Sequence, residues 1–180
     1  MSNFFKLLFI IVAVIFLTGC NNMKIEDFEN TTPTFVPQDY FNGKIKAYGL
    51  VKDRSGNIIR TFKADLIGSW DKDGIGTLKE YFVFDDGQKQ ERVWTLKPLK
   101  NSKSEFIGTA NDVIGKAHMK AIGNTVVIDY TLEVDYKKTK ININVKDWLH
   151  LQEDGVIINH SKMKKFGLVV GELVITMIKQ

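Results

Sequence analysis

The residue with the clearest chemistry in the sequence is Cys20, the single cysteine of the chain. It follows Leu17, Thr18 and Gly19, and a cysteine that ends such a run matches the bacterial lipobox. The thiolate at that position takes up a diacylglycerol, and two or more acyl chains give stable membrane anchoring at about 0.8 kcal/mol per buried methylene. With this thiol lipidated the chain has no cysteine left for a disulfide, so a hydrophobic core has to hold the fold.

The residues before Cys20 have the order of a secretory signal peptide. Lys6 supplies a positive charge, and the run 7–17 is apolar throughout. A membrane-spanning helix needs about 20 apolar residues, so this run is too short to span and suits a cleaved signal over residues 1–19. The residue after the cysteine is Asn21 instead of the Asp that retains lipoproteins in the inner membrane of enteric-type bacteria. We therefore expect the outer membrane, with the protein facing the periplasm.

Catalytic and metal-binding patterns are missing from the sequence. It contains no Gly-x-Ser-x-Gly elbow, and His118, His150 and His160 lack the His-x-His or His-Glu-x-x-His spacing of a zinc site. The net charge of +4 is spread along the chain without a long basic run, which disfavours nucleic-acid binding. We therefore expect no enzyme activity, no metal or cofactor, and no nucleic-acid partner.

The elements that have to position the remaining polar residues are β-strands. From Gly43 onward apolar and polar residues alternate, and turns rich in Gly and Asp recur at about 8–12 residues, which is typical of an all-β sandwich or barrel. Strands are predicted at 43–51, 57–67, 76–84, 89–97, 103–110, 112–121, 124–135, 140–151, 156–163 and 167–178. About 8–10 one-sided strands leave unpaired edges unless the sheet closes, so we favour a single antiparallel up-and-down barrel over a sandwich.

The segment between the cysteine and the first strand, residues 20–42, contains two of the three prolines, Pro33 and Pro37. This composition predicts a tether, which at about 3.3–3.6 Å per residue would hold the domain several tens of Å from the bilayer. The expected organisation is a signal peptide at 1–19, a lipidated tether at 20–42 and a β-barrel domain at 43–180.

Charged residues interrupt the apolar rows that should face the inside of the sheet. They are Arg60, Glu80, Arg92 and Asp147. If residues 85–87 form a three-residue hairpin loop, Glu80 falls opposite Arg92, where opposite charges can pair. In the same way, a four-residue loop at 152–155 would set Asp147 opposite His160. A charge that is buried alone is costly, so these side chains have to pair, or meet water or a ligand.

Two interpretations of these inward charges stay open. In the first they form a structural ion-pair cluster, or a bulge turns them outward. In the second they anchor the head group of an apolar ligand in a cavity. Small residues such as Gly108 and Ala117 favour internal space, unless tryptophan or phenylalanine side chains fill it. The residues predicted to bind a ligand are Arg60, Glu80, Phe82, Arg92, Trp94, Tyr130 and Asp147.

Several motifs recur in an order that is typical of one family. They are Phe41-x-Gly43, Ala47-Tyr48-Gly49, Asp53-Arg54-Ser55-Gly56, Leu78-x-Glu80, Asp86-Gly87, Arg92-Val93-Trp94, Ala110-x-Asp112-Val113-Ile114-Gly115, Asp147-Trp148 and Lys165-Phe166-Gly167-x-Val169-x-Gly171-Glu172. Together they resemble the bacterial lipoproteins of domain-of-unknown-function family 3833 over the whole mature domain. Tyr48 departs from a Trp that is usual there, and His160 from an Arg. The resemblance implies a lipocalin-like barrel and an envelope lipid or fatty acyl ligand.

Two functions compete at this stage. The first is an outer-membrane lipoprotein, anchored through Cys20, that binds or shuttles a fatty acyl or phospholipid-like amphiphile. The alternative is a non-catalytic envelope scaffold or assembly protein with a filled barrel. The interior of the barrel distinguishes the two functions. A continuous apolar cavity of roughly 300 Å³ or more supports ligand binding, whereas a packed interior supports the scaffold.

Overall fold

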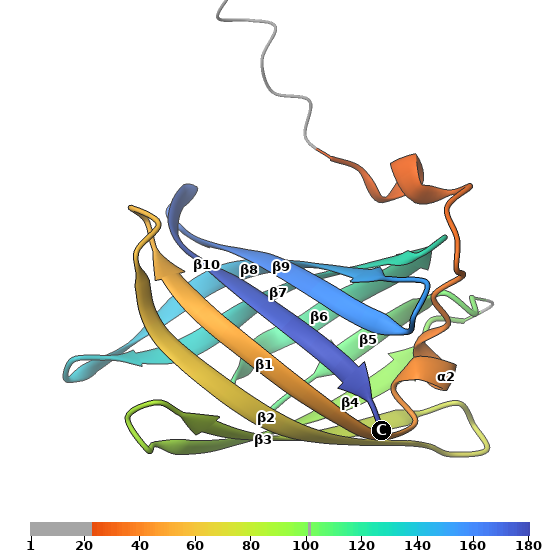
Figure 1. Ribbon diagram of the computed structural model, residues 1–180, viewed down its shortest axis with the longest axis horizontal. Coiled ribbons are helices and arrows are strands. Elements are labelled where there is room, and N and C mark those ends of the chain that lie inside the picture. The colour runs from red at the N-terminus through yellow and green to blue at the C-terminus, as the bar shows by residue number, and fades with distance from the viewer. Residues whose placement is uncertain (1–22, 101) are drawn as a thin grey trace, which may run out of the picture.

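The computed structural model describes residues 23–100 and 102–180, and these residues form a closed barrel of ten strands (Figure 1). Two short helical segments come first, η1 (Ile25–Phe28) and α2 (Pro37–Tyr40). The strands are β1 (Gly43–Asp53), β2 (Ile58–Trp70), β3 (Gly76–Phe84), β4 (Lys89–Pro98), β5 (Glu105–Thr109), β6 (Val113–Ile122), β7 (Thr125–Tyr136), β8 (Thr139–Leu151), β9 (Val156–Lys165) and β10 (Leu168–Lys179). Neighbours in sequence pair antiparallel, and β10 pairs with β1. The predicted all-β, up-and-down barrel is confirmed.

Alternation along each strand explains why the sheet closes with one apolar face inside. In β2, Phe62, Ala64 and Leu66 are buried, whereas Lys63 and Asp65 between them are exposed. Successive side chains of a strand point to opposite faces, so every strand of this kind adds an apolar row to the interior. Closure then pairs the first and last strands, and no edge of the sheet is left open.

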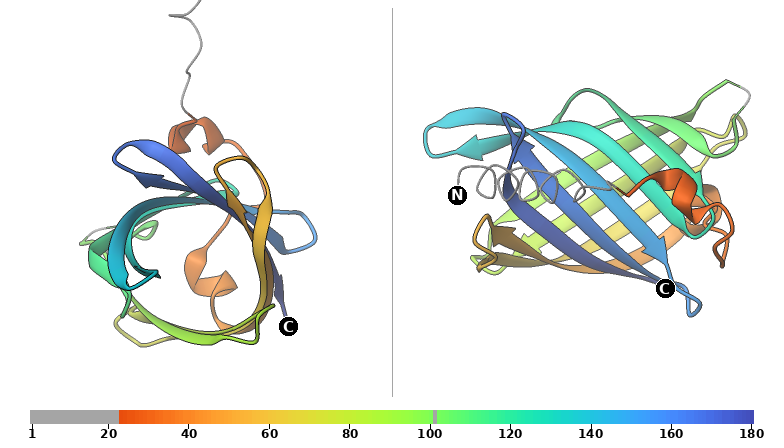
Figure 2. Two further views of the ribbon diagram at one scale, coloured as in Figure 1. Left: turned by 90° about the vertical axis from the view of Figure 1, so that its left-hand side faces the viewer. Right: turned by 90° about the horizontal axis from the view of Figure 1, so that it is seen from above.

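The two ends of the barrel differ. Because the strands run up and down, the β1–β2, β3–β4, β5–β6, β7–β8 and β9–β10 hairpins lie at one end, which we call the mouth. The other connections and α2 lie at the opposite end, which we call the floor. Figure 2 shows α2 at the far end of the barrel when the molecule is viewed from the mouth.

The floor is made by the segment that was expected to be a tether. Phe35, Tyr40 and Phe41 are buried there, with ring centroids 5.4–5.8 Å apart. The Tyr40 hydroxyl donates a hydrogen bond to the carbonyl of Met177 at 3.0 Å, which fixes α2 against β10. Residues 23–42 therefore belong to the folded unit and are not an extended tether, because their aromatic residues close an apolar interior that would otherwise meet water.

The outer wall carries a second cluster that explains a break in the strand pattern. Val127 on β7 and Trp148 on β8 are apolar residues on outward-facing positions, and both are buried. They pack against Ile25 and Phe28 of η1, which lies over β6 and β7 and reaches Trp148 at its edge. Neither helical segment of the described chain has the length and apolar character that crossing a membrane as a helix requires. The predicted signal peptide and Cys20 lie outside the described residues.

Candidate ligand-binding cavity

A cavity of about 620 Å³ lies inside the barrel. Phe41 closes it at the floor, and at the other end its lining includes residues of the mouth hairpins such as Gln88 and Lys140. The structure places all seven side chains predicted from the sequence on its walls. They are Arg60, Glu80, Phe82, Arg92, Trp94, Tyr130 and Asp147.

Aromatic side chains form much of the apolar lining. Near the mouth, the Phe82 ring meets the Phe62 ring edge-on at 5.4 Å and stacks on the Phe84 ring at 6.2 Å. Deeper inside, Trp94 and Tyr130 meet edge-to-face with centroids 5.5 Å apart. Such arrangements suit the charge distribution of aromatic rings and hold the side chains in fixed positions. The aromatic rings that line the cavity therefore also pack against one another.

The space beside Gly108 is only partly free. A Cβ atom at Gly108 would lie 3.2 Å from the ring of Trp94, so the missing side chain of this glycine makes room for that indole. Ala117 lies directly opposite Gly108 on β6 and lines the cavity as well. Small residues thus create internal space, and Trp94 fills a part of it.

One wall holds a buried cluster of charges around Arg92. Its Nε atom donates to both Asp112 oxygens at 2.9 Å, and one of its terminal nitrogens lies 2.8 Å from Asp112 Oδ2. Glu80 lies directly opposite Arg92 in the register, as predicted, and its Oε2 atom is 3.6 Å from Arg92. Asp112 is therefore the closer partner, and it occupies Nε and one terminal nitrogen, the two-donor edge with which a guanidinium binds a carboxylate.

Glu80 is buried beside a cation that is mainly engaged elsewhere. Burial raises its pKa to about 7, and the charge of Arg92 offsets this only in part. Its Oε2 atom has no hydrogen-bond partner among the described residues. A buried carboxyl in this position gains from keeping its proton, because the charged form is poorly solvated.

Asp147 is the second buried carboxyl of the cluster. Burial raises its pKa to about 6, while the hydrogen bond from Tyr130 and the charge of Arg92 act in the opposite direction. The Tyr130 hydroxyl donates to Asp147 Oδ2 at 3.2 Å. With Glu80 and Asp112 this makes three carboxyls near one guanidinium, so the charge of Arg92 is already offset by residues of the protein.

The predicted partner of Asp147 is wrong by one residue. The loop after β8 has three residues, 153–155, because Gln152 and Val156 close it through a backbone hydrogen bond of 2.8 Å and Gly155 has φ +80°. Asp147 therefore lies opposite Ser161 instead of His160. His160 points outward, and its Nε2 atom lies 3.5 Å from Glu172.

Arg60 stands at the mouth, apart from the Arg92 cluster. One of its terminal nitrogens donates to Asp86 Oδ2 at 2.9 Å and to Gln88 Oε1 at 2.6 Å. The guanidinium lies 3.6 Å from the centre of the Phe84 ring, which is close enough for a cation–π interaction. Its Nε atom is buried without a partner among the described residues. Arg60 thus places a guanidinium at the entrance, beside Asp86 and Gln88.

Sequence reasoning missed two features of the cavity. Asp112 was seen only as part of a motif, although its side chain is the closest partner of Arg92. Asn159 and Ser161 are fully enclosed polar residues of β9, and the Ser161 hydroxyl donates to Asn159 Oδ1 at 3.0 Å. A correct register for β9 would have found both, because it places them on the inner face.

No group of three or more His, Cys, Asp or Glu side chains in the described part of the chain is arranged to hold a metal ion.

A closed antiparallel barrel with one deep internal cavity defines a lipocalin-like barrel protein. The family model described as "Protein of unknown function (DUF3833)" matches residues 14–179, and the chain belongs to this family. The resemblance inferred from the motifs is thereby confirmed. A search of curated proteins finds no match.

Among solved structures, the chain is similar to the S-type phycobiliprotein lyase CPES from Guillardia theta. The two share 10% identity with a TM-score of 0.56, and the match covers 88% of this chain and 94% of that one. At this level of identity the similarity supports the fold alone.

Proposed function

We propose that the barrel binds one elongated amphiphile, with its apolar chain inside the cavity and its head group at the mouth. The ligand class that fits best is a fatty acyl chain or a phospholipid-like molecule. In this proposal the protein holds or carries the ligand within the cell envelope and performs no chemistry on it.

The cavity of about 620 Å³ is the observation that carries the proposal. Ligand sites typically enclose about 300–1,000 Å³, and this cavity lies within that range, with apolar walls interrupted by the Arg92 cluster and by polar residues at the mouth. A buried acyl chain gains about 0.8 kcal/mol per methylene, so a long chain supplies enough free energy for micromolar binding. The scaffold alternative assumed a filled barrel and loses support from the same observation, and the architecture shared with a phycobiliprotein lyase also suggests a small-molecule-binding role.

The distribution of charge favours the mouth for an acidic head group. Arg92 is buried between Asp112 and Glu80, whereas Arg60 lies nearer the solvent at the entrance and pairs with one carboxylate, Asp86. A carboxylate or phosphate at Arg60 gains a charge-assisted hydrogen bond. The negatively charged group then stays away from the acidic cluster, and only the buried part of the ligand lies beside that cluster. Of the two arginines predicted to bind a ligand, Arg60 is therefore the proposed partner of the head group.

The proposal includes anchoring of the chain by a lipid on Cys20, in the outer membrane and facing the periplasm. The support comes from the sequence: the apolar run 7–17, the residues before the cysteine, and Asn21 after it. Replacing Cys20 by Ser should give an uncleaved or soluble protein that no longer fractionates with membranes. Normal processing together with normal membrane recovery of that variant would rule the anchor out.

Ligand binding is tested with a protein that begins at Met23, the first described residue, after removal of co-purified lipid. A fatty acid and the fatty alcohol of equal length are titrated into it, and binding is followed by tryptophan fluorescence and calorimetry, because Trp94 lines the cavity. Both ligands should saturate at one per chain. The Arg60→Ala substitution should weaken the acid about tenfold more than the alcohol, a difference of about 1.4 kcal/mol.

The matched control is Arg54→Ala, in the β1–β2 loop at the same end of the barrel but outside the cavity lining. It removes the same charge and should leave both affinities unchanged. Equal weakening by the two substitutions would show that the net charge of the mouth, and not a contact with Arg60, sets the preference. If no amphiphile saturates at micromolar concentrations, the proposed function is wrong.

A further inference from the structure

We propose that one wall of the barrel lies on an anionic lipid surface and that the tip of the β9–β10 hairpin enters it. The wall consists of η1, β7, β8, β9 and this hairpin. It is separate from the cavity, so the inference goes beyond ligand binding.

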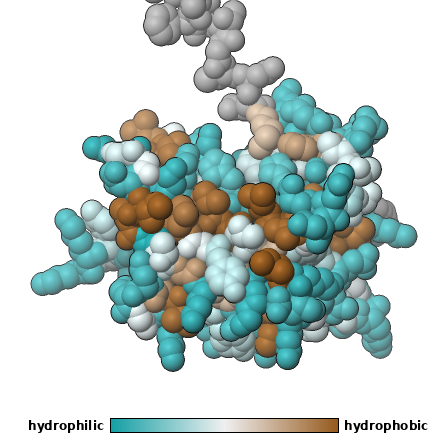
Figure 3. Space-filling model, in the orientation of Figure 1, coloured by the Kyte–Doolittle hydropathy of each residue, from teal (hydrophilic) through white to brown (hydrophobic). Residues whose placement is uncertain are grey.

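The hairpin tip carries apolar side chains that the rest of the molecule leaves uncovered. Phe166 is 91% exposed and Leu168 is 73% exposed. Phe166 has φ +51° and Gly167 has φ +80°, and such a tight turn holds the aromatic ring at the outermost point of the hairpin. Figure 3 shows apolar surface over this hairpin and the adjoining part of β10. Exposed aromatic and aliphatic residues at a turn are suited to insertion at a membrane interface.

Lysines surround the apolar tip. Lys164 and Lys162 point outward from β9 directly behind the tip, and the described residues give neither an ion-pair partner. Lys162 lies opposite Lys146 of β8, and like charges in facing positions of a sheet repel each other. Asp129 compensates Lys146 at 3.4 Å, and Glu172 of β10 lies opposite Lys162 in the register, so Lys164 is the lysine without an acidic residue directly beside it. An apolar tip with a basic surround is complementary to anionic lipids, to which each nearby lysine adds about 1 kcal/mol.

The N-terminal end of the described chain lies against the same wall. Cys20 precedes Met23 by three residues, which span at most about 11 Å when fully extended. Because Ile25 packs on Trp148 of β8, a lipid on Cys20 would hold this wall close to the bilayer. The views in Figures 1 and 2 agree that η1 and the β9–β10 hairpin lie on the same side of the barrel. This step rests on the proposed lipidation, whereas the exposed tip and the lysines do not.

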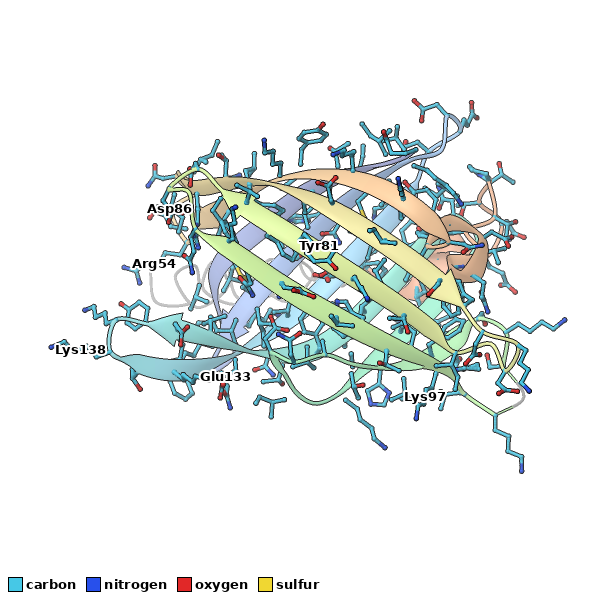
Figure 4. All side chains as sticks on the ribbon, turned by 90° about the horizontal axis from the view of Figure 1, so that it is seen from below. Arg54, Tyr81, Asp86, Lys97, Glu133 and Lys138 are labelled. Carbon is cyan, nitrogen blue, oxygen red and sulfur yellow. The ribbon has the colours of Figure 1, made fainter. Side chains whose placement is uncertain are left out.

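The test uses the full-length lipidated protein in vesicles of phosphatidylglycerol and phosphatidylcholine. Since Cys20 is the single cysteine of the chain, Phe166→Cys provides one reactive thiol for an environment-sensitive fluorophore once Cys20 is lipidated. Quenching by lipids with a nitroxide on the acyl chain reports contact with the bilayer. The label at position 166 should be quenched at least threefold more than a label introduced by Tyr81→Cys, which Figure 4 shows on the opposite wall.

Further variants separate the alternatives. Leu168→Cys provides a second labelling position and should be quenched as well. Lys162→Glu combined with Lys164→Glu should reduce quenching at position 166 in the anionic vesicles. Equal quenching at positions 166 and 81 in the vesicles overturns the proposal. A label at position 166 that is shielded in the cell's own membranes but not quenched in the vesicles also overturns it, because the tip would then contact a protein partner. Protein that is not recovered with vesicles overturns it together with the lipidation of Cys20, while the ligand titration is unaffected by either result.

Discussion

Replacing Glu80 by Gln tests how the buried charge cluster is held. The pKa of Glu80 is raised from its ordinary value of 4.5 to about 7 by burial. Between these two values the folded protein keeps a proton that the unfolded chain has released. The contribution of Glu80 to the unfolding free energy is therefore fully present below about pH 4.5, falls as the pH rises to about 7, and is absent above it.

The difference between the two pKa values corresponds to about 3 kcal/mol, since each pKa unit is worth about 1.4 kcal/mol. Gln has nearly the same shape as the protonated acid and does not titrate. The stability of Glu80→Gln relative to wild type should therefore increase by about 3 kcal/mol between pH 4.5 and pH 8. Urea denaturation of the protein starting at Met23, at a series of pH values, measures this directly.

The control is Asp65→Asn, an outward-facing carboxylate that pairs with Lys46 and whose side chain is 60% exposed. It should change stability little and without this trend. A constant difference between Glu80→Gln and wild type over this pH range would refute the raised pKa. A trend of the opposite sign would mean that the charge of Arg92 outweighs burial and that Glu80 is stabilised in its ionised form.

Two further predictions concern the cluster and the floor. Arg92→Met should cost about 3–5 kcal/mol in urea denaturation, because it leaves buried carboxylates unpaired. Adding Asp112→Asn should recover more of this loss than adding Glu80→Gln, since the Arg92 nitrogens lie 2.8 Å from Asp112 and 3.6 Å from Glu80; equal recoveries would contradict this ranking. Gly68→Ala should lower the melting temperature by several degrees, because its Cβ would lie 1.8 Å from the carbonyl oxygen of Phe41, and an unchanged melting temperature would refute the close packing of the floor.

The strands and one of the two charge pairings follow from local sequence. Alternation marks the inward face of each strand, and the Asp85–Gly87 loop is short enough to set the register, so Glu80 was correctly placed opposite Arg92. The loop at 153–155 closes in the same three-residue geometry with a left-handed glycine, Gly155. Treating it as a four-residue loop shifted β9 by one position, which exchanges inside and outside for every side chain of the strand.

Other parts of the site depend on contacts that no local pattern reveals. Arg92 lies on β4, whereas Asp112 lies in the connection between β5 and β6. Their contact therefore joins segments that no short hairpin sets in register. The floor is made by Phe35 and Phe41, which stand among prolines and polar residues without any periodicity. Only the closed barrel shows that these two rings cover its end. The sequence was therefore sufficient for the barrel and insufficient for the floor of its cavity.

Native mass spectrometry of the full chain purified from its own membrane tests most directly whether the barrel holds an amphiphile. The protein should carry one additional molecule with the mass of a fatty acid or phospholipid, beyond any lipid on Cys20. The Ala117→Phe variant, which places a ring in the cavity, should carry none. A wild-type protein without a bound amphiphile, or a variant that retains it, would contradict the account.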